Sequence, residues 1–286
     1  MKKGMLISLV LFLIFTGCEK TKEISIAANE WIGYAPIFYA NEKGWLKKDK
    51  IRVIRTVSLA ESLKLYKSGL VNSIAATQYE YFQIKDKVKP IILLDKSYGG
   101  DMILSNRSIE ELKKAKKIDV YLEMGSVNYL LLQYFAKKYN IPLTKMNFHS
   151  NDQEQLSQQS FDMKKNILIV TYSPYDKLFI KKGFKVIDST RNDKDLLVID
   201  AIFIHKHCEN RQRFKNLKKQ IDLAIEEIKN DPKKAFGVIK NYYPDYKYED
   251  FKKALEKIKW INNPNKDLLL RLKKIGFNTK DLIDEN

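Results

Sequence analysis

Short apolar runs alternate with longer segments of helical periodicity through most of this chain, and that alternation constrains its fold more than any other feature. Ile24 to Ala28, Ile51 to Thr56 and Ser73 to Ala76 have the length and composition of strands. Ala35 to Lys43 and Leu59 to Lys67 lie between them and have the periodicity of helices. Strands that alternate with helices predict an α/β fold with mixed, mostly parallel sheets covered by helices on both faces.

A second set of strands and helices follows Gly99-Gly100. The first predicted strand of this set is Met102 to Ser105, and the last is Lys185 to Ile187. The segments Asp95 to Asp101 and Thr190 to Lys194 read as extended crossings between the two sets, and the chain after Ile204 is predicted to be helical. We therefore expect two lobes, residues 23–98 with 199–286 and residues 99–198. Ligands of such sheets lie beyond the carboxyl ends of the strands, so a cleft between the lobes is the expected site.

The N-terminus has the parts of a secretory signal: two lysines, then an apolar run from Met5 to Phe15. The run has about 11 residues, whereas a bilayer-spanning helix needs roughly 20. Phe15-Thr16-Gly17-Cys18 resembles a bacterial lipobox, whose cysteine becomes the diacylated first residue, although an aliphatic residue is commoner than Phe15 there. We expect residues 1–17 to be cleaved and residues 18–22 to tether an extracytoplasmic domain, in the periplasm or at the cell surface. An ordinary cleaved signal with an incidental cysteine is the alternative.

Charge and cysteine content narrow the function classes further. The net charge of +17 becomes +15 once Lys2 and Lys3 leave with the signal. The remaining lysines are scattered along helix-like segments without an arginine-rich arm or zinc finger, which argues against nucleic acid as a partner. Cys18 and Cys208 are the only cysteines, so lipidation of Cys18 excludes an internal disulfide. His205-Lys206-His207-Cys208 lacks further ligands and reads as the exposed end of a strand; no metal or cofactor is expected.

Five segments resemble a known family in their order along the chain. Trp31 to Leu46 is similar to the opening of solute-binding proteins for nitrate, sulfonates, taurine and thiamine pyrimidine precursors. Matches follow at Ser58 to Gly69, Ile109 to Ser126, Ile167 to Gly183 and Asp231 to Ala235. The resemblance implies a two-lobed periplasmic-binding fold of the second type. It also implies a monomer that delivers a small solute to an ABC permease in the cytoplasmic membrane, with no catalytic residue and no cofactor.

Polar and aromatic residues at the predicted strand ends and helix starts are the candidate solute ligands. Trp31, Tyr34 and Tyr172 offer aromatic faces, and Asp101 and Glu123 could accept hydrogen bonds from an amine or amidine. The complete set is Asn29, Glu30, Trp31, Tyr34, Ser58, Glu61, Thr77, Gln78, Tyr98, Asp101, Glu123, Ser126, Asn128, Tyr172 and Tyr175.

Each assignment has a structural alternative. Ser58 and Ser126 precede helices whose N-termini could bind an anionic group, but serine is also an ordinary N-cap. Trp31 and Tyr34 could simply pack the first turn, and Glu123 could pair with a surface lysine.

The sequence is compatible with three functions. A binding lipoprotein for an ABC importer is the leading hypothesis, and the mixture of acids and aromatics favours an organic, nitrogen-bearing solute over nitrate. The same fold can instead report a solute to a membrane signalling protein, and neighbouring genes for a permease and an ATPase would separate the two. A pyrimidine-precursor enzyme of this fold is the third hypothesis. Its cysteine-rich motif has no counterpart here, and the chain carries an export signal.

Overall fold

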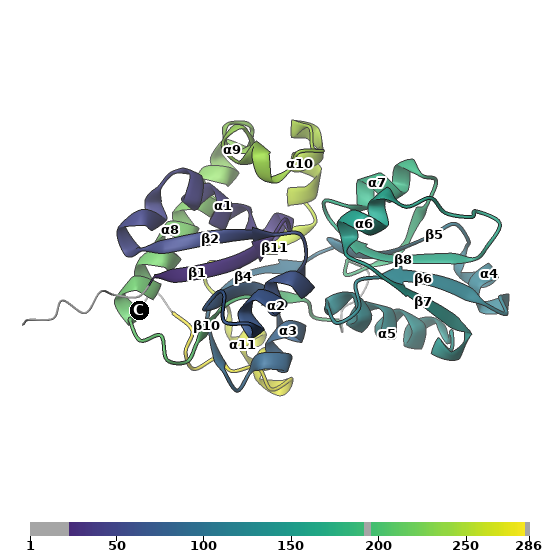
Figure 1. Ribbon diagram of the computed structural model, residues 1–286, viewed down its shortest axis with the longest axis horizontal. Helices are drawn as coiled ribbons and strands as arrows, with labels where there is room; N and C mark the ends of the chain where they lie inside the picture. The colour runs from purple at the N-terminus through teal and green to yellow at the C-terminus, as the bar shows by residue number, and fades with distance from the viewer. Residues whose placement is uncertain (1–22, 192–195, 284–286) are drawn as a thin grey trace, which may run out of the picture.

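Two β-sheets stand side by side in the computed structural model, which describes residues 23–191 and 196–283 (Figure 1). The signal segment, Cys18 and the tether lie outside the described residues, as does part of the second predicted crossing. The first sheet has the order β11 (Ile258–Trp260), β4 (Val88–Ser97), β10 (Ile199–His205), β3 (Ser73–Thr77), β1 (Ile24–Asn29) and β2 (Ile51–Thr56). The second has the order β7 (Met146–Ser150), β6 (Ile118–Leu122), β8 (Ile167–Tyr172), β5 (Asp101–Ser105) and β9 (Lys185–Ser189).

Both sheets are mixed, as the strand–helix alternation predicted. In the first sheet β1 is parallel to β2 and β3, whereas β10 is antiparallel to β3 and β4, and β11 is antiparallel to β4. In the second sheet β6 is parallel to β7 and β8, and β5 is antiparallel to β8 and β9. Among the described strands five pairs are antiparallel and four are parallel, so the expectation of mostly parallel sheets is wrong. The reason is that the strands that carry the chain between the sheets run against their neighbours.

The first crossing is shorter than predicted. Asp95 to Ser97 still belong to β4, and Asp101 already begins β5, so residues 98–100 alone join the sheets. The extension has a partner that the sequence did not reveal: β11 pairs with Asp95 to Ser97. The expectation of a wholly helical C-terminal region is corrected by this short strand.

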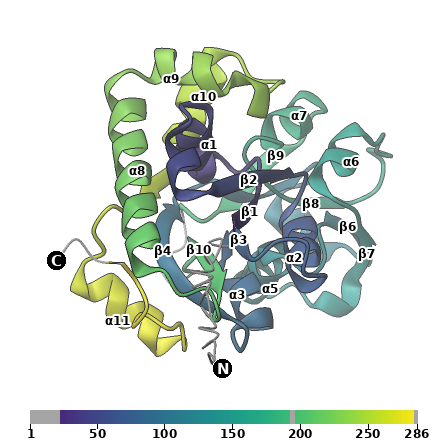
Figure 2. The same cartoon turned by 60° about the vertical axis from the view of Figure 1, so that its left-hand side comes forward.

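Helices cover both faces of both sheets (Figures 1 and 2). One continuous apolar core includes side chains of α1 (Ala35–Glu42), α8 (Arg211–Asn230), α9 (Pro232–Ile239), α10 (Tyr248–Leu255), α6 (Gln153–Gln158) and α7 (Asp176–Lys181). A second core includes side chains of α2 (Leu59–Lys67), α3 (Gln78–Ile84), α11 (Lys266–Lys274), α4 (Ile109–Lys114) and α5 (Val127–Tyr139). Short 3-10 turns are η1 (Ile32–Tyr34), η2 (Trp45–Asp49), η3 (Leu143–Lys145) and η4 (Lys240–Tyr242). Within residues 23–191 and 196–283, none of the helices is both long and apolar enough to cross a bilayer.

Strand direction gathers polar residues at one edge of the first sheet. The parallel strands β1 and β3 end there, at Asn29 and Thr77. The antiparallel strand β10 begins there, and its Asp200 is paired in register with Thr77 on one side and Asp95 on the other. This is also the edge from which the chain leaves for the second sheet, so the same residues face β5 and β8.

Candidate functional site

A small cavity lies between the two sheets. Residues of both sheets line it: Asn29, Trp31, Tyr34, Leu59, Thr77, Asp101, Val127, Tyr172 and Asp200. Six of the nine are among the ligands nominated from the sequence, and Leu59, Val127 and Asp200 are not. The space within the cavity that a water molecule can reach is about 10 Å³. This is about the room that one water needs and far below the roughly 300 Å³ at which small-molecule sites usually begin, so this conformation is a closed one.

Aromatic rings and one amide join the two sides of the cavity. The Trp31 ring meets the Tyr172 ring edge to face, with centroids 6.1 Å apart, and Tyr175 packs against Tyr172 at 5.6 Å. Asn29, at the end of β1, donates from Nδ2 to the Tyr172 hydroxyl at 3.1 Å. Because Tyr172 ends β8 of the second sheet, this bond connects the two sheets directly.

The position of Trp31 depends on two glycines. A Cβ on Gly33 would collide with the Asp95 carboxyl group and the indole nitrogen of Trp31. A Cβ on Gly100, in the first crossing, would collide with the Trp31 ring. The Trp260 indole of β11 donates to the Gly33 carbonyl at 3.0 Å and so stabilises the turn that carries Trp31. The close approach of the indole therefore explains the glycine in Trp31-Ile32-Gly33-Tyr34.

Three carboxyl groups are buried beside the cavity: Asp95, Asp101 and Asp200. The Trp31 indole donates to Asp95 at 3.2 Å, and the Tyr34 hydroxyl donates to Asp200. None of the ion pairs found among the described residues involves these carboxyl groups. Burial raises the pKa of Asp101 to about 6. Burial also holds the pKa values of Asp95 and Asp200 well above the usual range, and repulsion from Asp95 raises that of Asp200 further.

Carboxylates of the protein itself occupy the two helix N-termini that face the cleft. Glu123, after β6, accepts from the backbone N–H of Ala60 in α2 at 2.7 Å. Glu80, in α3, accepts from the backbone N–H of Val127 in α5 at 2.9 Å. Each helix is thus capped by an acid from the opposite side of the cleft. Burial raises the pKa of Glu80 to about 7 and that of Glu123 to about 8.

Ser58 and Ser126 are N-caps of these two helices. Ser58 accepts from Glu61 N at 3.1 Å, and Ser126 accepts from Asn128 N at 3.3 Å. Together with Glu123, Asn128 and Tyr175 they lie at the cleft without lining the cavity. The Asn128 side chain accepts from Gln153 at 2.7 Å, within the second sheet's side.

Four nominated residues are used elsewhere. The Glu30 carboxylate pairs with Arg55, and the Glu61 side chain accepts from Val57 N at 2.7 Å. The Gln78 amide bonds to the backbone of Leu197 and Ile199. Tyr98 lies beneath two cations, Arg191 and Lys259, at 4.7 and 3.9 Å from its ring centroid. Proximity to a strand end nominated them, but the structure places each of them against partners outside the cavity.

Sequence reasoning missed Asp95, Asp200 and Glu80. Asp200 interrupts an apolar run and Asp95 directly follows one, and an acid in such a position is almost never fully buried unless it is paired. Glu80 follows Thr77 at the spacing of a capping box, which the structure forms.

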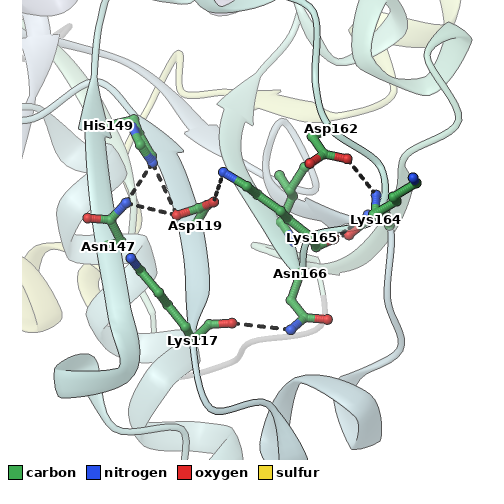
Figure 3. A network of polar contacts seen from close by, with 10 residues as sticks. Lys117, Asp119, Asn147, His149, Asp162, Lys164, Lys165 and Asn166 are labelled. Atoms are coloured by element: carbon green, nitrogen blue, oxygen red, sulfur yellow. Dashed lines mark hydrogen bonds and ion pairs between the residues drawn. The ribbon is translucent and has the colours of Figure 1, made fainter.

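Polar clusters away from the cleft have a structural character. Asp119 of β6 accepts from Asn147 at 2.8 Å and lies 3.3 Å from His149 and 3.4 Å from Lys165, joining β6, β7 and the turn before β8 (Figure 3). His205, at the end of β10, accepts from the backbone N–H of His207 at 3.3 Å. Across the described ranges, no three His, Cys, Asp or Glu side chains are placed to hold a metal ion.

Two mixed sheets with a cavity enclosed between them define the periplasmic-binding-protein fold, which confirms the predicted fold class. No protein-family model matches the chain, and no curated protein matches it by sequence.

Solved structures match the chain closely in fold. The ligand-binding component of an ABC-type import system from Staphylococcus aureus, solved with zinc bound, is 12% identical and has a TM-score of 0.72, over 92% of this chain and 97% of that one. The alkanesulfonate-binding protein SsuA from Xanthomonas axonopodis pv. citri, bound to MOPS, is 10% identical with a TM-score of 0.72, over 89% and 90%. A Candida albicans protein with the generic periplasmic binding protein fold is 14% identical with a TM-score of 0.65, over 93% and 99%. At these identities the likeness establishes the fold.

Proposed function

We propose that this chain is an extracytoplasmic solute-binding lipoprotein that captures a small organic solute, containing nitrogen or sulfur, for an ABC importer. The main support for this proposal is the cavity that aromatic, amide and carboxyl side chains line from both sheets. Likeness in fold to an import-system component and to an alkanesulfonate-binding protein supports the same function. The protein works as a monomer that binds without catalysing a reaction, and its partners are the solute and a permease.

The proposed mechanism is closure of two lobes, residues 23–98 with 199–286 and residues 99–198. The Asn29–Tyr172 and Glu123–Ala60 hydrogen bonds join these lobes in the closed state. A solute that touches both sides of the cavity adds contacts that an open state lacks, and it therefore shifts the population toward closure.

Lipidation of Cys18 would hold this receptor near the permease, with residues 18–22 as the tether. The Cys18→Ser variant, expressed in the native host, should move from the membrane fraction to the soluble fraction and lose incorporation of labelled fatty acid. The Cys208→Ser variant is the matched control and should stay membrane-bound. Retention of Cys18→Ser at the membrane would contradict the anchor.

Capture is tested by native mass spectrometry on protein purified from its own host. The wild type should carry a small-molecule mass increment, and small-angle scattering should show a smaller radius of gyration with the solute than after its removal. Trp31→Ala should lose the increment. Trp45→Ala, which removes an indole of η2 away from the cavity, should keep it. An unchanged increment in Trp31→Ala, or no compaction on solute binding, would contradict the proposal.

A further inference from the structure

The charged side chains that line the cavity are all acidic. Asp101 and Asp200 are among its lining residues, and Asp95 lies directly behind Trp31. The lining contains no lysine, arginine or histidine. Buried carboxylates are costly unless a positive charge or several hydrogen-bond donors offset them, and here each has few donors. A bound cation would remove that cost, whereas a bound anion would add to it.

Three of the hydrogen-bond donors that line the cavity are already used by the protein, whereas the Tyr172 hydroxyl accepts from Asn29. The Trp31 indole donates to Asp95, the Tyr34 hydroxyl to Asp200 and the Thr77 hydroxyl to Glu80. An acceptor, in contrast, is left over: Asn29 Oδ1 is fully buried, lines the cavity and has no hydrogen-bond partner. A buried acceptor without a partner costs about 1–3 kcal/mol, so the site is complete only with a donor from the solute.

The helix N-termini at the cleft, where an anionic group could bind, are already occupied by side chains of the protein. Free N–H groups at helix N-termini bind anionic groups, but Glu123 and Glu80 already accept from the N-termini of α2 and α5. A sulfonate or carboxylate entering the cleft would have to displace a buried carboxylate, and it would meet Asp101 and Asp200 in the cavity.

We infer that the solute is a small cation with a protonated nitrogen, an amine or an amidinium. Its N–H groups are directed at Asp101, Asp200 and Asn29 Oδ1, and its carbon skeleton lies against Trp31 and Tyr172. This inference rests on the proposed function and names its substrate class. The edge-to-face pair of Trp31 and Tyr172 suits the inference, because aromatic faces attract cations.

Four probes of one shape but different charge test the inference: benzamidinium, benzamide, benzoate and benzenesulfonate. Dissociation constants are measured by calorimetry on the mature protein near neutral pH. Benzamidinium should bind at least about tenfold more tightly than the other three, which corresponds to about 1.4 kcal/mol. Failure of benzamidinium to bind, or equal or tighter binding of either anion, would overturn the inference.

Two variants and a control show where the probe binds. Asp200→Asn and Asp101→Asn should each weaken benzamidinium by about tenfold or more, because each removes a carboxylate beside the cavity. Asp119→Asn, which alters a buried carboxylate far from the cavity, should leave the affinity unchanged. Circular dichroism verifies folding, so Asp101→Asn serves if Asp200→Asn does not fold. Unchanged benzamidinium affinity in a folded cavity variant would also overturn the inference.

Failure of this inference is distinguishable from failure of the proposed function. A retained anionic solute that compacts the protein in small-angle scattering would refute the cation and leave solute capture standing. Benzamidinium binding without any compaction would refute capture by closure and leave the charge preference standing.

Discussion

Asp95 and Asp200 lie opposite each other on the neighbouring antiparallel strands β4 and β10, and both are buried. Like charges in directly opposed positions destabilise a sheet, and burial makes the effect larger. Burial is the main cause of the raised pKa values of both groups; repulsion from Asp101 raises the pKa of Asp95 further, and repulsion from Asp95 raises that of Asp200. The chain therefore maintains a costly pair of acids at the cavity, which is the behaviour of a binding site built for a positive partner.

Replacing Asp200 should stabilise the empty protein at neutral and alkaline pH. A carboxyl group whose folded pKa is raised is protonated in the fold at low pH and imposes no penalty there. The penalty develops as the pH rises above the unfolded value of about 4. Asp200→Asn should thus gain at least about 1 kcal/mol in urea unfolding at about pH 8 and little at about pH 4. A loss of stability at pH 8 would contradict the account.

Asp119 should show the opposite behaviour. Burial works to raise its pKa, but hydrogen bonds from Asn147 and His149 and the charge of Lys165 outweigh burial and lower it (Figure 3). A lowered pKa adds stability above the unfolded value, and this contribution is lost as the pH falls through the folded pKa. Asp119→Asn should cost about 1–2 kcal/mol at neutral pH, with the cost shrinking below about pH 4. A cost that is the same at both pH values would be inconsistent with this network.

Gly100→Ala should displace Trp31 and weaken solute binding. The new methyl group would enter the space of the indole ring and approach the Lys257 carbonyl to 3.1 Å. Overpacking of this kind costs about 1–3 kcal/mol in stability. Gly237→Ala is the matched control: its methyl would meet nothing within 4 Å in helix α9, so stability should rise by up to about 1 kcal/mol. Retained probe affinity and unchanged tryptophan fluorescence in Gly100→Ala would disprove the packing argument.

Removing the acid that caps α2 across the cleft should favour the open state. Glu123→Ala leaves the Ala60 N–H without its acceptor and deletes one bond between the two sides. We expect a larger radius of gyration in the empty protein by small-angle scattering. Glu110→Ala, which removes an exposed acid of α4 that pairs only locally with Lys113, should leave the radius of gyration unchanged. Equal dimensions of the wild type and Glu123→Ala would show that the bond does not hold the cleft closed.

Much of this architecture was predictable because periodicity reports burial. The strand–helix alternation predicted the α/β class, and strand ends nominated Asn29, Trp31, Thr77 and Tyr172, which do line the cavity. Asp95 and Asp200 were not predicted as site residues, because their role depends on the register between β4 and β10, strands about a hundred residues apart. Strand β11 was not predicted, because three residues are too few for a periodic signal.

The most direct measurement is the proton balance of benzamidinium binding, determined by calorimetry at about pH 6 in two buffers of different ionisation enthalpy. Asp101 has a pKa of about 6, and Asp95, Asp200, Glu80 and Glu123 have raised pKa values, so the empty site holds protons at this pH. A cation favours the ionised carboxylates, and the account predicts net release of protons and tighter binding as the pH rises. Net uptake of protons, or affinity that falls with rising pH, would contradict it.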